Sequence, residues 1–141
     1  MNSLSALLEQ ELTALQAVLA TLQTERAALQ DRSAEALLVA TNAKSEAVAR
    51  AVHLEQERRA LVEAIPGNPP AAASRSLAEL KRLATECRQH NDANGLLIRG
   101  QRRRIEGSLN VLRGGRAAAD TYGRDGETRH LRGPGTTLAS Y

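Results

Sequence analysis

The chain carries three long stretches of aliphatic residues at helical spacing, separated by two short interruptions. In the first stretch, residues 4–30, leucine recurs every seven positions, at Leu8, Leu15, Leu22 and Leu29. Ser3 is a plausible N-cap for this helix. Asp31-Arg32-Ser33 breaks the pattern, and Ser33 can cap a second helix over residues 34–65. The pattern therefore predicts a helical hairpin at the start of the chain.

The second helix has a less regular apolar stripe. Its members are Leu37, Leu38, Thr41, Val48, Ala51, Val52, Leu61 and Ile65. The segment 54–59 is interpreted as a mostly solvated face, with Glu55 and Arg59 as an i,i+4 ion pair. The proline-rich segment 66–70 then ends the helix, because proline lacks an N–H donor and clashes with the preceding turn.

A third helix is expected over residues 77–113, after a loop that continues to Ser74. Ser76 and Glu79 have the spacing of a capping box at its start. One stripe recurs every seven residues at Leu77, Ala84, Asn91, Ile98, Ile105 and Leu112. Its companion stripe is Leu80, Cys87, Asn94, Gln101 and Ser108. The seam is polar in the middle, and a buried asparagine in a coiled coil lowers stability but fixes register.

Two features of this third helix stay open to interpretation. The polar segment 89–94 is a register-setting seam, an exposed helix face or a contact with a partner protein. Three glycines in the helix interior, Gly95, Gly100 and Gly107, either allow a close approach of another helix or make this helix prone to fraying.

The last 28 residues cannot extend these helices, because they hold six of the ten glycines. They also hold both tyrosines, and the chain has no Phe or Trp. A core of Leu, Val, Ile and Ala favours a thin bundle. The predicted fold class is all-α: an elongated antiparallel helical bundle or coiled coil of three helices, residues 1–113, with a flexible, disordered Gly-rich tail, residues 114–141.

The sequence offers no constellation for catalysis, so we predict that the protein is not an enzyme and needs no cofactor or metal. His53, His90 and His130 are scattered, and the single Cys87 excludes an internal disulfide. Cys87 lies on a helical stripe, where a small buried residue is expected. No apolar run approaches the ~18 residues of a membrane span. Without a signal peptide, the chain is expected to be cytoplasmic and not inserted in a membrane.

The net charge of +3 conceals an asymmetry along the chain: residues 1–65 carry −3 and residues 66–113 carry +5. The basic part includes a run of four arginines, Arg99, Arg102, Arg103 and Arg104. This run is interpreted as a solvated face with ion pairs to the acidic hairpin, as a surface for an acidic partner, or as phosphate contacts to RNA. Because no aromatic residues interleave with it, nucleic-acid binding is not expected.

Four segments together resemble the FlgN family of flagellar type III export chaperones. They are Ala34-Glu35-Ala36-Leu37-Leu38, Glu57-Arg58-Arg59-Ala60-Leu61, Asn91-Asp92-Ala93-Asn94-Gly95-Leu96-Leu97-Ile98 and Tyr122-Gly123-Arg124-Asp125-Gly126. The resemblance implies a cytoplasmic chaperone that binds C-terminal helical segments of the hook–filament junction proteins FlgK and FlgL. It further implies that cargo binds between Leu96 and Tyr141, and that Tyr122 corresponds to the tyrosine with which the family contacts the export-gate protein FlhA.

The residues themselves agree with this function. An apolar end on a weakened third helix can pack around an amphipathic cargo helix. The candidate cargo-binding residues are Leu97, Ile98, Ile105, Leu109 and Leu112. Tyr122 is the candidate for gate binding, because a lone aromatic residue is a natural anchor. A structural coiled-coil adaptor and a small RNA-binding regulator remain the alternative functions.

Overall fold

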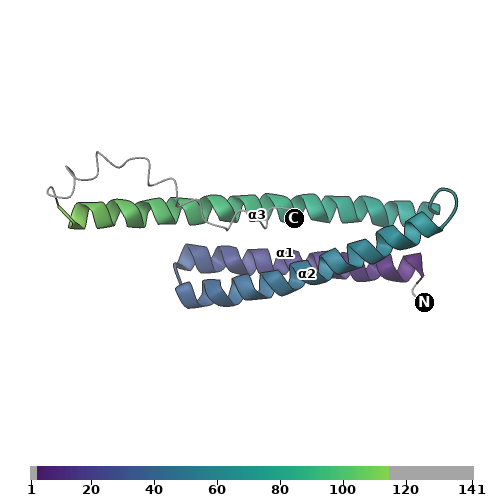
Figure 1. Cartoon of the computed structure of the whole chain (residues 1–141), viewed down its shortest axis with the longest axis horizontal. Coiled ribbons are helices and arrows are strands. Elements are labelled where there is room, and N and C mark those ends of the chain that lie inside the picture. Colours follow the sequence, from purple (N-terminus) through teal and green to yellow (C-terminus); the bar gives the residue numbers. More distant parts are fainter. Residues whose placement is uncertain (1–2, 115–141) are drawn as a thin grey trace.

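The computed structural model describes residues 3–114, which form α1 (Leu4–Asp31), α2 (Ala34–Ala64) and α3 (Ala71–Leu112) (Figure 1). No strand occurs within this range. α1 and α2 form an antiparallel hairpin, and α3 returns parallel to α1 in an elongated rod. The predicted all-α bundle of three helices is confirmed. The predicted tail lies outside the described residues after Gly114, so the division into a helical domain and a tail stays a prediction.

Both helices of the hairpin begin at the serines expected to cap them. Ser3 Oγ accepts a hydrogen bond from the Ala6 N–H, and Ser33 Oγ accepts one from the Ala36 N–H, both at 3.2 Å. Between the helices Arg32 adopts the left-handed conformation, with φ 54°. This conformation closes α1, because the Arg32 N–H reaches back to the last carbonyl groups of the helix.

α3 begins six residues earlier than the capping-box pattern predicts. Its N-cap is Pro70, and the Ser74 N–H donates to the Pro70 carbonyl at 3.1 Å. The expected loop to Ser74 and the expected cap at Ser76 are therefore wrong. Proline fixes a φ that suits the entry to a helix, and three alanines with the highest helix propensity follow it. Ala73 is also buried in the core, which favours the longer helix.

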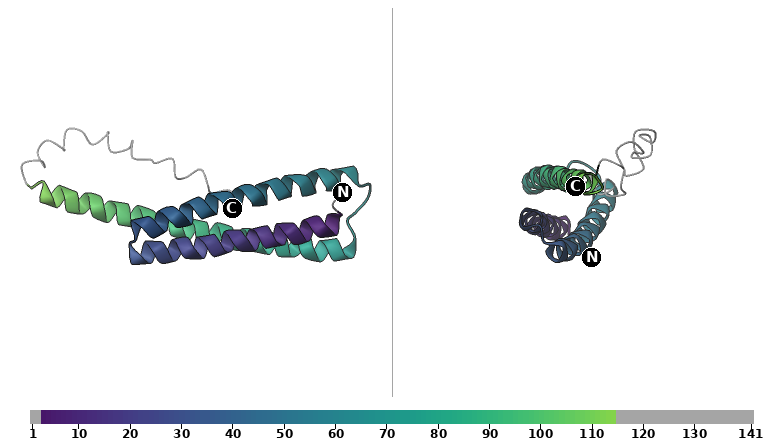
Figure 2. Two further views of the ribbon diagram at one scale, coloured as in Figure 1. Left: turned by 90° about the horizontal axis from the view of Figure 1, so that it is seen from below. Right: turned by 90° about the vertical axis from the view of Figure 1, so that its left-hand side faces the viewer.

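α1 lies against both other helices, whereas α2 and α3 hardly contact each other directly. Viewed along the rod, the three helices form an open triangle (Figure 2). The core is aliphatic, as the composition requires. Its buried members include Leu7, Leu8, Leu15, Val18, Leu22, Ala51, Leu54, Leu80, Leu83 and Cys87.

α2 buries only part of the predicted stripe: Ala51 is buried, and Val48 and Leu61 pack against the core. Leu38 and Ile65 are exposed, whereas Ala40, Lys44 and Leu54 are buried. α2 has few large apolar residues, so small alanines and a paired charge decide which face packs on α1. The segment 54–59 is not simply solvated either, because Arg58 Nε contacts Glu11 Oε2 of α1 at 2.5 Å. The predicted pair of Glu55 and Arg59 is confirmed at 2.7 Å.

Leu22→Ala is expected to lower the free energy of unfolding by about 2–4 kcal/mol, because truncating a buried leucine removes apolar contacts and leaves a cavity. Leu22 is 1% exposed and lies in the core cluster. Denaturant titration measures the change. Leu112→Ala is the matched control, because Leu112 is 81% exposed and should lose little stability. Equal stability of the Leu22 variant and the parent would contradict the assignment of Leu22 to the core.

Candidate functional site

α3 is longer than the hairpin on which it packs. It has 42 residues, against 28 in α1 and 31 in α2. Gln101 Nε2 donates to the Leu29 carbonyl at 2.6 Å, close to the end of α1 at Asp31. Beyond this level α3 projects past the α1–α2 turn without a helix beside it in the described part of the chain (Figure 1). We call residues 104–112 the overhang.

The overhang carries an apolar stripe of three residues, Ile105, Leu109 and Leu112. Their i, i+4, i+7 spacing places them on one face of α3. They are 61%, 43% and 81% exposed, respectively. Ile105 follows Gln101 by four residues, so the stripe continues the face that packs on α1. The stripe thus lies on the face of α3 that packs on α1, but past the point where α1 ends.

The five predicted cargo-binding residues divide between two environments. Leu97 and Ile98 are half-buried on the part of α3 beside the hairpin. Ile105, Leu109 and Leu112 form the exposed stripe. Tyr122 lies outside the described residues. The assignment of these residues to cargo and gate binding stays a prediction.

A hollow of about 260 Å³ lies at the base of the overhang, between α3 and the α1–α2 turn. It is lined by Ala28, Leu29, Arg32, Ser33, Ala34, Leu37, Gln101, Arg104 and Ile105. Sequence reasoning missed it, because its walls come from three helices whose relative register the heptads do not give. One signal was present: the third predicted helix is longer than either helix of the hairpin.

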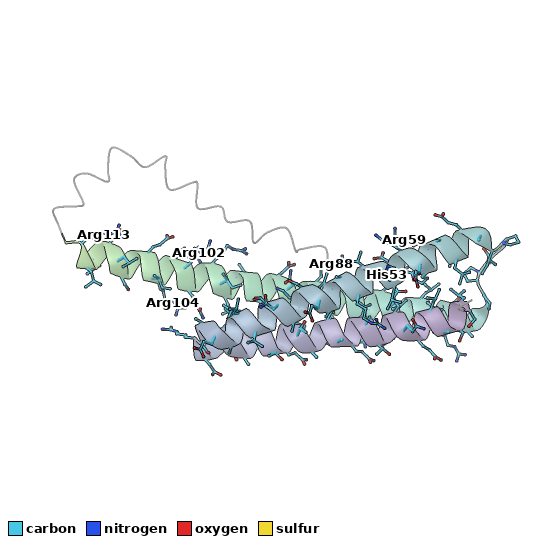
Figure 3. The ribbon with its side chains drawn as sticks, turned by 60° about the horizontal axis from the view of Figure 1, so that its bottom comes forward. His53, Arg59, Arg88, Arg102, Arg104 and Arg113 are labelled. Carbon is cyan, nitrogen blue, oxygen red and sulfur yellow. The ribbon has the colours of Figure 1, made fainter. Side chains whose placement is uncertain are left out.

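The arginines near the overhang are exposed, and within residues 3–114 none of the four predicted arginines forms an ion pair. The expected ion pairs to the acidic hairpin are therefore wrong. Figure 3 shows Arg104 pointing toward the end of the hairpin, with Arg102 and Arg113 on the other side of α3. From Arg99 to Gly114 the sequence holds five arginines and one acidic residue, Glu106. The overhang itself holds only Arg104 and Glu106 as charged residues, so its apolar face lies within a longer segment, 99–114, that is basic as a whole.

The three glycines of α3 do not bring another helix close. A Cβ at Gly95 would meet only the Arg99 side chain of the same helix, and one at Gly100 or Gly107 would meet nothing within 4 Å. The interpretation of close helix approach is therefore wrong. α3 continues through all three positions, which remain sites of weak helix propensity.

A buried polar network joins the three helices below the overhang. Glu25 of α1 is fully buried and pairs with Lys44 Nζ of α2 at 2.8 Å. Asn94 of α3 donates to Glu25 Oε1 at 2.9 Å. Lys44 also donates to Asn91 Oδ1 of α3 at 3.2 Å. The polar seam predicted for α3 is confirmed at Asn94, but its charged partners were missed because isolated charges in a helical pattern suggest exposed positions.

Side chains of α3 also bond to the backbone of α1 at a repeat of seven residues. Cys87 Sγ contacts the Leu15 carbonyl at 3.6 Å. Asn94 Nδ2 donates to the Leu22 carbonyl at 2.9 Å, one heptad later. The hydrogen bond from Gln101 Nε2 to the Leu29 carbonyl follows after another seven residues on both helices. These contacts fix the register of α3 on α1, because a slip by one residue would break all of them.

Burial raises the pKa of the Cys87 thiol, and the nearby Glu86 carboxylate raises it further. The folded state therefore holds this proton more tightly than the unfolded state. The resulting stabilisation is complete below the ordinary thiol pKa near 9 and is lost as pH rises through the higher folded value. Thermal melts at about pH 8 and about pH 10 should show an alkaline loss that is smaller in Cys87→Ala. The same alkaline loss in both proteins would contradict this role.

Other chemistry is sparse in the described range. Within residues 3–114 no group of three His, Cys, Asp or Glu side chains could hold a metal ion. His53 lies on α2, where its Nε2 is 3.0 Å from Glu57 Oε1. No helix among the described residues is long and apolar enough to cross a membrane.

The geometry defines a class of protein: a slim coiled-coil bundle whose longest helix carries an exposed apolar stripe beyond the hairpin. The chain belongs to the FlgN family, since the family model described as FlgN protein matches residues 1–130. This is a family of flagellar export chaperones rather than enzymes, so the resemblance seen in the sequence is confirmed. Neither a curated protein nor a solved structure matches the chain.

Proposed function

We propose that the protein is a cytoplasmic chaperone for the hook–filament junction proteins FlgK and FlgL. It binds their C-terminal helical segments, prevents premature assembly and delivers them to the type III export gate. The match of the FlgN family model over residues 1–130 carries this proposal. The overhang supports it, because an exposed i, i+4, i+7 stripe is the surface that helix-in-groove recognition uses.

The cargo helix covers the stripe and buries apolar groups that water now reaches. Ile105 and Leu112 supply most of this area, since they are the more exposed members. Leu97 and Ile98 extend the contact toward the hairpin. The cargo segment loses conformational freedom on binding, which limits the affinity and favours release.

Co-purification of the full chain with FlgK and FlgL, separately, tests the proposal. A stable complex with the C-terminal segment of either protein is the expected result. Absence of binding to both would overturn these partners. A variant truncated after Gly114 tests the alternative of a structural adaptor. If the protein is only an adaptor, removing residues 115–141 should leave its binding to FlgK and FlgL and their delivery unchanged. An RNA shift that falls steeply with log salt concentration would instead favour the RNA-binding regulator.

Tyr122 is proposed to bind the export-gate protein FlhA. Tyr122→Ala should leave the melting temperature and cargo affinity unchanged, because Tyr122 lies outside every heptad stripe. It should weaken gate binding by about 2 kcal/mol, or about 30-fold, as loss of an aromatic anchor does. Titration of the variant against both partners measures the two effects. Tyr141→Ala is the control, and equal effects of the two substitutions would contradict a specific role for Tyr122.

A further inference from the structure

We propose that the overhang takes an acidic amphipathic helix that stacks end-on against the α1–α2 turn. One apolar side chain of this helix enters the hollow, and its acidic residues face the arginines of α3. The inference rests on the proposed chaperone function and specifies the kind of cargo helix that the site accepts.

The position of the partner helix follows from the register of α1 and α3. α1 contacts α3 at successive heptads up to the Leu29–Gln101 pair and ends at Asp31. A helix placed on the continued axis of α1 would face Ile105, Leu109 and Leu112 as α1 faces the preceding turns. These three residues span about 10 Å at 1.5 Å per residue, so the partner contributes about two turns to the contact.

The hollow is the natural seat for an anchoring side chain. A cavity of about 150 Å³ with apolar walls can hold a benzene molecule, so a hollow of about 260 Å³ admits one large side chain of a helix. Ala28, Leu29 and Ile105 supply apolar surface, and Arg104 stands at the same wall. The end of a helix can reach this site, because Ala34 on the α1–α2 side of the hollow is exposed.

The positive charge around the overhang favours an acidic helix over a second copy of the chain or residues 115–141 as the bound segment. The segment from Arg99 to Gly114 has five arginines against one carboxylate, and the predicted run makes no ion pair within residues 3–114. A second copy of this segment would place like charges together, which costs free energy. Residues 115–141 carry four arginines and three acidic residues, so they do not supply an acidic helix either. An acidic partner gains attraction from Arg104, which lines the hollow, and from the net positive charge of this segment.

Two synthetic peptides of about 18 residues test the charge preference directly. Both carry leucines at i, i+4 and i+7, flanked by glutamates in one peptide and by glutamines in the other. Fluorescence anisotropy with the full chain should show at least about 10-fold tighter binding of the glutamate peptide, with a difference that shrinks as salt is raised. Equal binding of the two peptides, or no binding of either, would overturn the inference.

Matched variants of the full chain test the location. Ala34→Trp fills the hollow and should weaken binding at least about 10-fold, whereas Ala36→Trp changes an exposed residue that does not line it. Arg102→Glu with Arg104→Glu should cause a similar loss, and the corresponding lysine variants should restore binding. Arg75→Glu with Arg88→Glu is the charge-matched control on exposed parts of α3. Equal effects of site and control variants would overturn the location.

The same variants separate this inference from the proposed function. If FlgK or FlgL segments bind but the hollow-filling and charge-reversed variants bind them equally well, the chaperone function stands and the inference fails. If the glutamate peptide binds at the site but neither junction protein does, the inference stands and the named cargo is wrong. Sedimentation that shows a dimer, dissociated by Ile105→Asp, would assign the stripe to a second copy and overturn the inference.

Discussion

Glu25→Ala is expected to lower the free energy of unfolding by about 3–5 kcal/mol. The substitution removes the partner of Lys44, whose Nζ lies 2.8 Å from Glu25 Oε2 in a site where Glu25 is fully buried. It also removes the acceptor of a hydrogen bond from Asn94. In this variant the Lys44 ammonium group is still removed from water on folding, but it no longer gains the attraction of the Glu25 carboxylate. Chemical denaturation followed by circular dichroism measures the loss.

The control replaces the whole network. In a variant with Glu25→Leu, Lys44→Met and Asn94→Leu no charge stays buried alone, so its stability should lie near that of the parent or above it. If the triple variant loses as much stability as Glu25→Ala, the polar contacts of the network stabilise the fold more than apolar packing of Leu and Met at the same positions. The triple variant should also pair α1 and α3 less uniquely, because the Asn94 bond to the Leu22 carbonyl, the central one of the three that set their register, is gone. Cysteine cross-linking between α1 and α3 would report such slippage.

The sequence predicts the helices well because local signals define their ends. Ser3 and Ser33 cap the first two helices, and the prolines after Ile65 end the second. The leucine heptad of α1 identifies the core face, and its members Leu8, Leu15, Leu22 and Leu29 are all buried. These features depend on a few neighbouring residues, so pattern alone suffices.

The start of α3 and part of the buried face of α2 depend on tertiary packing and were not predicted. Ala73 adds burial that a local capping pattern does not include, and it moves the start of α3 upstream. In α2 the alanines and Lys44 are buried because α1 offers close packing and the Glu25 carboxylate. Similarly, the hollow exists only because the α1–α2 turn lies level with Gln101.

The two halves of the contact between α1 and α3 differ in chemistry. Leu80, Leu83 and Cys87 belong to the aliphatic core. Farther along α3, the cross-helix bonds come from Asn94 and Gln101. Apolar burial stabilises the first half without strong direction, whereas directional hydrogen bonds in the second half set where the overhang begins. The bonds from Asn94 and Gln101 to the α1 backbone thus set which α3 residues project past the hairpin.

Ile105→Asp combined with Leu112→Asp is expected to weaken binding of the FlgK and FlgL segments by at least about 100-fold, or about 3 kcal/mol. Each aspartate places a charge where the cargo helix would bury an apolar side chain, and that charge must be desolvated on binding. Stability should change by less than about 1 kcal/mol, because the two side chains are 61% and 81% exposed in the free protein. Isothermal titration and thermal melts of the same preparations measure both quantities.

Val39→Asp is the control, because Val39 of α2 is 68% exposed and does not line the hollow at the base of the overhang. It should leave cargo affinity near the parental value. If the double variant unfolds, the two residues belong to the core, and the surface for cargo lies elsewhere. If Val39→Asp weakens binding as much as the double variant, added negative charge alone explains the loss. Retained binding by a folded double variant would exclude the stripe as the cargo surface, whatever the role of Tyr122 at the gate.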